Sequence, residues 1–315
     1  MKKDITIIGG SVIDVLASPV APDVFRTGSF PAKEIRLSFG GDALNEAVIL
    51  SRFGRDVQLI SKIGQDEAGA RILSFIKENG LSSESVIVES GTDTSVNIVL
   101  IDGQGERHFI TNPFGSQRRL SKEDIMPHVE TMADIVSFAS IFVSSKLDIK
   151  AMEELFRAIK EKPGRILAVD MTKAKNGETL EDLYGLLPYI DYILPNEEEI
   201  ALLTGEDDPG KNAEILIEAG VSCAVIKCGT KGCLIRTKDE LYRIPAYEVE
   251  HCVDTTGAGD CFAAGFLWAL SEGYSLPQCG QFACAAASCA VERVGATDGV
   301  VSLEEPMRRR KNLEN

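Results

Sequence analysis

The chain has 315 residues, with 33 Lys and Arg against 48 Asp and Glu, so its formal net charge is −15. Hydrophobic residues make up 44% of the chain and charged residues 26%, the balance of a globular protein with a sizeable core. A surface this acidic repels nucleic-acid phosphates and anionic lipid, so we expect neither nucleic acid nor membrane as a partner.

Short β-branched runs alternate with helical patterns along most of the chain. Predicted strands cover residues 4–9, 57–61, 141–144, 165–170, 192–195, 224–227 and 232–236. Predicted helices cover residues 43–53, 67–79, 150–161, 197–204, 211–219, 258–272 and 277–293. Several of the strands are continuous apolar runs, typical of strands buried on both faces. The alternation predicts an α/β protein whose mainly parallel central sheet carries helices on both faces.

Two stretches break this alternation. Residues 11–38 are rich in Pro, Ser and Val and have no helical period. Residues 94–111 indicate two strands, 95–101 and 106–111, around the turn Asp102-Gly103-Gln104-Gly105. We expect one domain over residues 1–315, with a small antiparallel appendage formed by about 12–38 and 94–111.

The N-terminal segment and the cysteines predict a cytoplasmic protein. Residues 1–10 contain no apolar stretch long enough for a signal peptide, and no apolar run approaches the ~20 residues of a membrane span. All eight cysteines lie between Cys223 and Cys289, without a CxxC pair or clustered histidines. We therefore expect buried reduced thiols and no zinc site. The basic run at 308–311 favours the negative end of a C-terminal helix.

The strongest local signal is the segment VDTTGAGD at residues 253–260, which an apolar helix follows. In the turn Gly257-Ala258-Gly259, backbone N–H groups can converge without large side chains in the way. The helix N-terminus adds partial positive charge, so the turn can hold a phosphate, and Asp260 beside it can accept a proton from a hydroxyl. Taken alone, the segment fits equally well a tight turn with an Asp that stabilises the helix.

Two other predicted helices begin at polar residues. Gly40-Gly41 exposes backbone to a ligand and Asn45 suits sugar hydroxyls, although a plain glycine turn with a polar helix start is the simpler account. Asn196 and Glu199 follow a strand, where acidic residues favour the helix dipole and a carboxylate can hold hydrated Mg²⁺. The P-loop, GxGxxG, HExxH, GxSxG and protein-kinase motifs are missing from the sequence.

The combination is more specific than its parts. Four segments occur in one order at domain-scale spacing: Gly40-Gly41-xxx-Asn45, Asn196-xx-Glu199, the loop KCGTKG at 227–232, and DTTGAGD at 254–260. Together they resemble the ribokinase-like (PfkB) family of sugar and nucleoside kinases, from about Asp4 to Val301. The resemblance implies a three-layer ribokinase-like fold, with the appendage as a β-sheet lid over the sugar. Such lids often pair between two subunits, so it also implies a homodimer.

The resemblance assigns roles to single residues. Asp260 is implied as the general base for the sugar hydroxyl, with Gly257, Ala258 and Gly259 as the anion hole for the γ-phosphoryl of ATP. Residues implied to bind the nucleotide are Asn196, Lys227, Gly229, Gly232 and Cys284. Residues implied to bind the sugar are Asp14, Gly41, Asn45 and the lid residues Asn97 and Arg107. Implied metal contacts are Glu199 for Mg²⁺ through water, and Asp254, Thr256 and Gly295 for K⁺.

Two positions depart from patterns seen in the family. Asp42 stands where some members carry a basic residue. Lys173 stands where several members carry Arg, so an anion contact there would be a point charge rather than a two-pronged one.

The sequence thus predicts an ATP-dependent kinase for the primary hydroxyl of a small sugar such as ribose, fructose or a ketodeoxy sugar acid. A nucleoside kinase is the near alternative, with the base packed on lid aromatics such as Phe25, Phe30, Phe109 and Phe114. The polar residues suited to a free sugar slightly favour the sugar kinase. A non-catalytic sugar sensor would be expected to lack the base or a glycine of the anion hole, and both are present.

Overall fold

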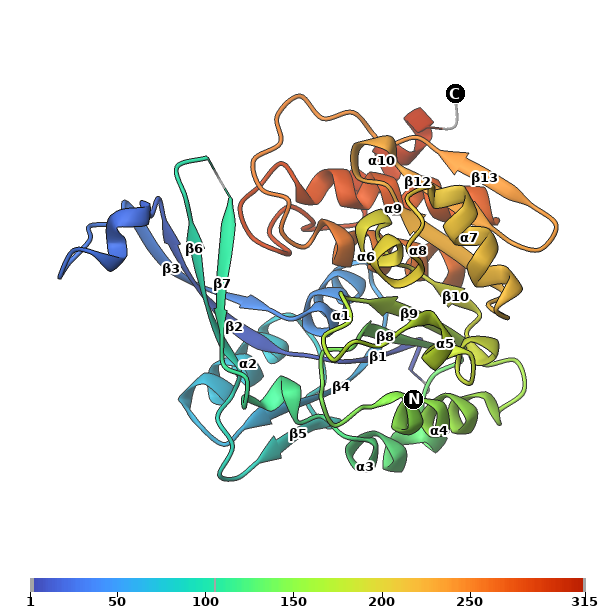
Figure 1. The fold of residues 1–315 in the computed structure, drawn as a ribbon, viewed down its shortest axis with the longest axis horizontal. Helices are drawn as coiled ribbons and strands as arrows, with labels where there is room; N and C mark the ends of the chain where they lie inside the picture. The colour runs from blue at the N-terminus through green and yellow to red at the C-terminus, as the bar shows by residue number, and fades with distance from the viewer. Residues whose placement is uncertain (1–2, 105, 314–315) are drawn as a thin grey trace.

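The computed structural model describes residues 3–104 and 106–313, and these build a nine-stranded main sheet (Figure 1). The strand order is β13-β12-β11-β10-β9-β8-β1-β4-β5. Its strands are β1 (Ile5–Ile8), β4 (Val57–Gly64), β5 (Val86–Glu89), β8 (Ile135–Ile141), β9 (Ile166–Met171), β10 (Tyr192–Ile193), β11 (Cys223–Lys227), β12 (Cys233–Arg236) and β13 (Leu241–Ile244). From β5 to β11 every pairing is parallel, while β11, β12 and β13 pair antiparallel. The carboxyl ends of the parallel strands therefore meet at one edge.

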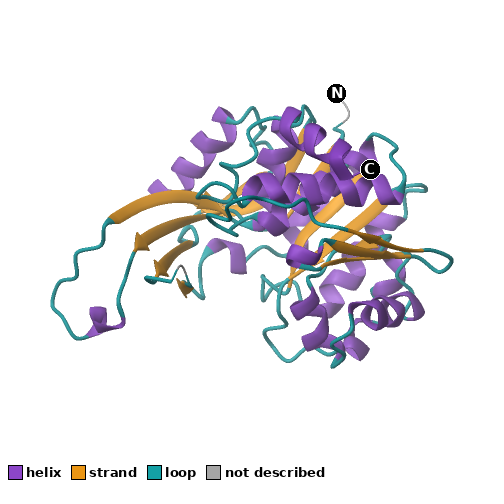
Figure 2. Cartoon of the chain, turned by 90° about the horizontal axis from the view of Figure 1, so that it is seen from above, coloured by secondary structure: helices purple, strands orange, loops and turns teal. Residues whose placement is uncertain are grey.

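Helices cover both faces of the sheet, as Figure 2 shows. On β1, Ile5 and Ile7 face one apolar cluster and Ile8 faces the other, as the two-residue repeat of a strand requires. The first cluster includes residues of α1 (Asp42–Arg52), α2 (Glu67–Glu78), α8 (Ala258–Ser271) and α9 (Leu276–Ala290), and α10 (Glu304–Leu313) packs on α9. The second includes residues of α4 (Ile149–Lys160), α5 (Leu180–Leu183), α6 (Glu197–Thr204) and α7 (Pro209–Glu218). The predicted three-layer architecture is confirmed.

A second, four-stranded sheet extends away from the main body (Figures 1 and 2). It consists of β3 (Glu34–Gly40), β2 (Val12–Ser18), β6 (Val96–Ile101) and β7 (Arg107–Thr111), in that order. This sheet, called the lid below, was predicted as antiparallel, but its central pair β2–β6 is parallel. The reason is that β2 follows β1 and β6 follows β5, and both preceding strands point the same way in the main sheet. Gly105 of the predicted turn lies outside the described residues.

The sequence-based prediction also misplaced one strand and missed two others. The predicted strand at 141–144 lies too late, because β8 ends at Ile141 and Phe142 adopts a left-handed conformation with φ 70°. The short outer strands β5 and β13 were not predicted. In the part of the chain that the structure describes, no helix is long and apolar enough to cross a membrane.

Helices α8 and α9 approach each other closely beneath the sheet. At Gly265 of α8, a side-chain Cβ would lie 2.9 Å from the Cβ of Ala286 and 3.1 Å from the Cα of Ala283. Small residues at this crossing let the two backbones pack together. Since the first turn of α8 carries Asp260, this contact also holds the catalytic candidate in place.

We expect Gly265→Val to destabilise the protein by about 2–3 kcal/mol, because the larger side chain forces α8 and α9 apart. Urea unfolding followed by circular dichroism measures the change. The control is Ala70→Val on the exposed face of α2, which carries only the helix-propensity cost of a β-branched residue, below ~1 kcal/mol. Equal losses in the two variants would contradict the close-packing argument.

Candidate active site

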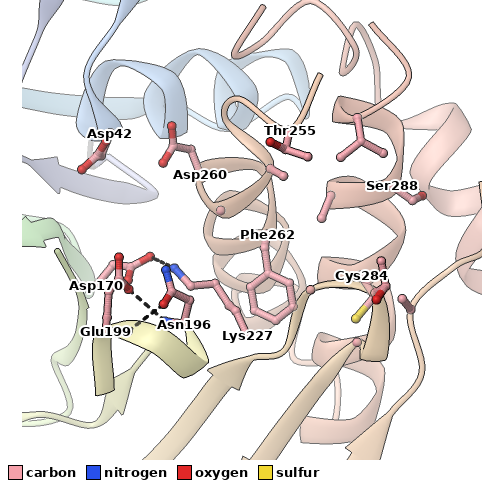
Figure 3. A pocket seen from close by; sticks show the side chains of 18 of the residues that line it. Asp42, Asp170, Asn196, Glu199, Lys227, Thr255, Asp260, Phe262, Cys284 and Ser288 are labelled. Carbon is pink, nitrogen blue, oxygen red and sulfur yellow. Dashed lines mark hydrogen bonds and ion pairs between the residues drawn. The ribbon is translucent and has the colours of Figure 1, made fainter. Parts of the chain in front are cut away.

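A cavity of about 520 Å³ opens at the carboxyl edge of the main sheet (Figure 3). Parallel α/β sheets bind ligands at this edge because strand ends and helix starts converge there. The sheet contributes Asp170 at the end of β9 and Lys227 at the end of β11, and the helix starts contribute Asp42 and Asp260. Predicted site residues that line the cavity are Asn196, Glu199, Lys227, Gly229, Gly232, Ala258, Gly259, Asp260 and Cys284.

The predicted anion-hole turn forms the entry to α8. Gly257 has φ 71°, and a side chain there would approach the Cα of Ala296 to 2.6 Å, so both conformation and space require glycine. Ala258 and Gly259 follow as the first residues of the 14-residue helix and line the cavity. The positive end of the helix dipole therefore faces the cavity, which suits a phosphoryl group.

Asp260 is held by Asn45, whose Nδ2 donates to Oδ2 at 2.6 Å. This bond joins the GGxxxN and DTTGAGD segments, 215 residues apart in the chain. Burial, and then the negative charge of Asp42, raise the pKa of Asp260 to about 8. Asp42 and Asp260 both line the cavity and lie at the upper left of Figure 3.

Asp42 and Asp170 were not among the predicted site residues. Asp42 is the first residue of α1 directly after Gly40-Gly41, and Asp170 is near the end of a buried parallel strand. Both positions are places where an α/β sheet presents side chains to a ligand, and this was the signal that could have found them. Thr255 of the DTTGAGD segment also lines the cavity, and other cavity-lining residues that the sequence did not indicate are Phe262, Tyr247 and Ser288.

Lys227 supplies positive charge next to the anion hole. Its ammonium group pairs with Asp170, and a Cβ at Gly259 would lie 3.7 Å from the Lys227 Nζ. Burial alone lowers the pKa of Lys227, but Asp170 and Glu199 outweigh it and the pKa is raised. Lys227 is therefore a cation at the pH of the cell.

The segment from Asn196 to Glu199 serves two purposes. The Asn196 side chain accepts from the Glu199 N–H at 2.8 Å, and the Glu199 carboxylate accepts from the Asn196 N–H at 2.9 Å. This capping box explains the helix start, whereas the sequence predicted only that acidic residues favour the helix dipole here. The same two side chains line the cavity, and a backbone bridge places Asn196 beside Lys227. The carboxyl groups near Lys227 suit a cation such as Mg²⁺ that keeps several of its waters.

The opposite wall of the cavity is less polar. The loop with Gly229 and Gly232 lies on one side, and Cys284 and Ser288 of α9 lie on the other. The Cys284 thiol donates to the Cys233 sulfur at 3.9 Å, and both cysteines are free thiols. From α10, Arg309 donates to the Ser288 hydroxyl at 3.0 Å, so the C-terminal helix supports this wall.

The lid carries the predicted sugar-binding pair. Asp14 on β2 and Asn97 on β6 are register partners, and the Asn97 Nδ2 donates to Asp14 at 2.9 Å. Burial raises the pKa of Asp14, and Asp42 adds to the rise. A side chain at Gly40 would collide with the Asp14 carboxyl, so the lid carboxyl lies against the Gly40-Gly41 turn. Gly41 has φ 94° and lies tightly against Gly10, which leaves no space for a side chain.

The residues predicted around K⁺ form one cluster. Asp254 accepts hydrogen bonds from the Thr256 N–H at 2.9 Å, the Thr256 hydroxyl at 2.7 Å and the Gly295 N–H at 2.9 Å. Arg107, predicted to face the sugar, pairs its guanidinium with Asp254, and its charge also acts on Asp14.

This geometry defines a phosphotransferase site: a carboxylate base candidate, a helix start for a phosphoryl group and a lysine beside it. The chain belongs to the pfkB family carbohydrate kinases, whose family model matches residues 2–302. It is 30% identical to an uncharacterized sugar kinase of Archaeoglobus fulgidus, over 80% of this chain and 97% of that protein. It is 26% identical to the ribokinase of Haemophilus influenzae, over 98% of both chains. The crystal structure of a putative ribokinase II of E. coli in complex with ATP and Mg²⁺ superposes with TM-score 0.85 at 21% identity, covering 99% of this chain and 100% of that one.

The pH dependence of catalysis provides a test of the Asp42–Asp260 pair. Asp260 must be ionised to accept a proton, so its raised pKa makes kcat/KM increase with pH up to about 8. Asp42→Asn removes a neighbouring negative charge, which lowers the pKa of Asp260 and moves the acid limb of the profile to lower pH. Asp148→Asn, which keeps the cap of α4, is the control and leaves the profile in place. An acid limb that stays fixed or moves to higher pH would contradict the coupling.

Proposed function

We propose that the protein transfers the γ-phosphoryl group of ATP to the primary hydroxyl of a small sugar, of the ribose, fructose or ketodeoxy sugar acid type. The observation that carries this proposal is the position of Asp260. Its carboxyl group lines the cavity at the first turn of α8, where Gly259 lies beside Lys227. A proton acceptor and a phosphoryl-binding helix start are therefore adjacent.

In the proposed reaction, the Asp260 carboxylate takes the proton of the sugar hydroxyl while the hydroxyl oxygen attacks the γ-phosphorus. The bond from phosphorus to the bridging oxygen breaks and ADP leaves, so Asp260 ends protonated and the sugar ends as its phosphate ester. Asn45 keeps the carboxylate oriented through its 2.6 Å bond. Lys227 and the start of α8 stabilise the negative charge on the transferred group.

The ATP position is proposed from the residues that line the cavity. We place the adenine between the loop containing Gly229 and Gly232 and the α9 segment at Cys284, and the phosphates toward α8. Glu199, with Asn196 beside it, would hold Mg²⁺ through water. When bound, Mg²⁺ neutralises phosphate charge. The structure of the E. coli protein contains ATP and Mg²⁺, which supports these two ligands for this chain.

The acceptor is the least specified part of the proposal. Asp14 and Asn97 give the lid a polar inner face suited to sugar hydroxyls. One observation supports the nucleoside kinase alternative: Phe109 pairs with Val99, two positions from Asn97, so it lies on the same face of the lid and is 55% exposed. Phe109 could therefore pack on a base. Phe25 and Phe114, two other candidates, are about four-fifths exposed.

We also propose that two copies associate through their lids. On the face opposite Asp14 and Asn97, the lid presents Ile35, Leu37, Ile98 and Ile110, each at least two-fifths exposed. The lid strands β3 and β7 are unpaired edges in the sheet order. A second copy would bury this apolar face and protect the edges.

Two further expectations accompany the function. Eight free cysteines, of which seven are buried, support a cytoplasmic location, where thiols stay reduced. The predicted K⁺ remains a prediction. Its proposed ligand Asp254 already accepts from Thr256, Gly295 and Arg107, so this carboxylate does not fit a bound cation as arranged here.

A coupled ADP-release assay over sugars, sugar acids and nucleosides tests the function. We expect one acceptor class with kcat/KM of about 10⁴ M⁻¹s⁻¹ or more. Asp260→Asn should lower kcat by roughly 10²- to 10⁴-fold, the usual contribution of a general base. Asp239→Asn, at an exposed position, is the control with unchanged rate. A wild-type rate in Asp260→Asn would refute the role of Asp260 as base. No ADP release by the folded wild type with any acceptor of the panel would favour the non-catalytic sugar sensor.

Replacement of Leu37 tests the proposed dimer. Leu37→Asp places a charge on the apolar lid face and should give a monomer. Leu202→Asp on α6, an equally apolar and more exposed position, should leave the dimer intact. Light scattering after size-exclusion chromatography measures the mass. A monomeric wild type, or a dimeric Leu37→Asp variant, would contradict association through the lid.

A further inference from the structure

We propose that Arg107 is a built-in cation for Asp254, which takes the place of a bound monovalent cation and latches the lid to the anion-hole loop. The proposal rests on the kinase function proposed above. It makes Arg107 a positioning residue that acts through Asp254. It also predicts that the enzyme works without K⁺.

The first argument is that several donors already contact the Asp254 carboxylate. Oδ1 accepts from the Thr256 N–H, the Thr256 hydroxyl and the Arg107 guanidinium, while Oδ2 accepts from the Gly295 N–H. Oδ1 is therefore fully occupied, and the positive charge beside it is already supplied by Arg107. A K⁺ ion would have to displace the guanidinium to reach Oδ1.

The second argument is burial. The Asp254 side chain is 4% exposed and the Arg107 side chain is 18% exposed. A carboxylate removed from water requires a partner of opposite charge, because leaving it unpaired is strongly unfavourable. Arg107 supplies that charge permanently, since a guanidinium stays protonated at every physiological pH. Once it is bound, no second cation is needed for neutrality.

The third argument is the place of the pair in the fold. Arg107 is the first residue of β7, next to the tip of the β6–β7 hairpin, and Asp254 lies 147 residues away in the loop that leads into α8. In Figure 1 the hairpin tip and this loop lie on the same side of the molecule. The pair thus bridges the free end of the lid to the main body.

The consequence for catalysis follows from what Asp254 holds. Through Thr256 it shapes the turn immediately before Gly257, whose backbone cannot tolerate a side chain. If the lid moves away, Asp254 loses its counter-ion and a bare negative charge remains beside the phosphoryl site. The anion hole is therefore most favourable to phosphate when the lid is latched, which couples sugar enclosure to phosphoryl transfer.

The activity test compares K⁺, Na⁺ and choline chlorides at constant ionic strength. Wild-type kcat/KM should be the same in all three salts. Arg107→Ala should lose about ten-fold or more in choline, the equivalent of breaking one buried charge contact, and K⁺ should restore most of the loss. Arg107→Lys keeps the charge and should show a smaller loss. Arg71→Ala, a surface arginine on α2, should behave as wild type.

A second readout does not depend on turnover. Thermal unfolding of Arg107→Ala should shift upward with K⁺ in a saturable way, while the wild type should show no K⁺-specific shift. The double variant Arg107→Ala/Asp254→Asn, with both charges removed, should lose the K⁺ response. Strong K⁺ activation of the wild type, or an Arg107→Ala variant indifferent to K⁺ in both readouts, would overturn the proposal. If no acceptor supports turnover, the kinase function fails, and the unfolding data still decide on Arg107.

Discussion

The site depends on one buried cation among carboxyl groups. Lys227 ends β11 and pairs with Asp170 at the end of the β9 strand, and Glu199 and Asp260 act on the same ammonium group. Carboxyl groups this close and this buried would repel one another without it. The same lysine lies beside Gly259. Its positive charge therefore both offsets the repulsion among these carboxyl groups and faces the proposed phosphoryl site.

The parallel sheet explains why segments so far apart in the chain share this cation. Strands β9 and β11 both pair with β10 and point the same way, so Asp170 and Lys227 arrive at one edge. Helix α6 follows β10, the strand between them, and begins at the same edge, which brings the capping box at Asn196 alongside. The lid leaves from this edge too, because β2 continues from β1.

Several residues combine a structural role with a role in the proposed chemistry. Asn196 and Glu199 cap α6 and also line the cavity. Asp254 holds the loop before Gly257 and also receives the lid arginine. The structural and the ligand-binding interpretations of these segments are therefore not alternatives. The free N–H groups at a helix start need hydrogen-bond acceptors, and a phosphate can supply them.

Many features of the fold and the site could be predicted from the sequence because they depend on interactions between neighbouring residues. The turn at Gly257, the helix start after Asn196 and most of the apolar strands depend on residues close together in the chain, and these were predicted. The Asn45–Asp260 bond, the charge of Asp42 beside Asp260 and the Arg107–Asp254 pair were not. They join residues far apart in sequence, and only the order and direction of strands decide which side chains meet. The parallel β2–β6 pair and the true extent of β8 belong to the same class, because strand pairing is a property of the whole sheet. Tertiary structure decided these features because distant charges interact only once the fold has removed them from water and placed them together.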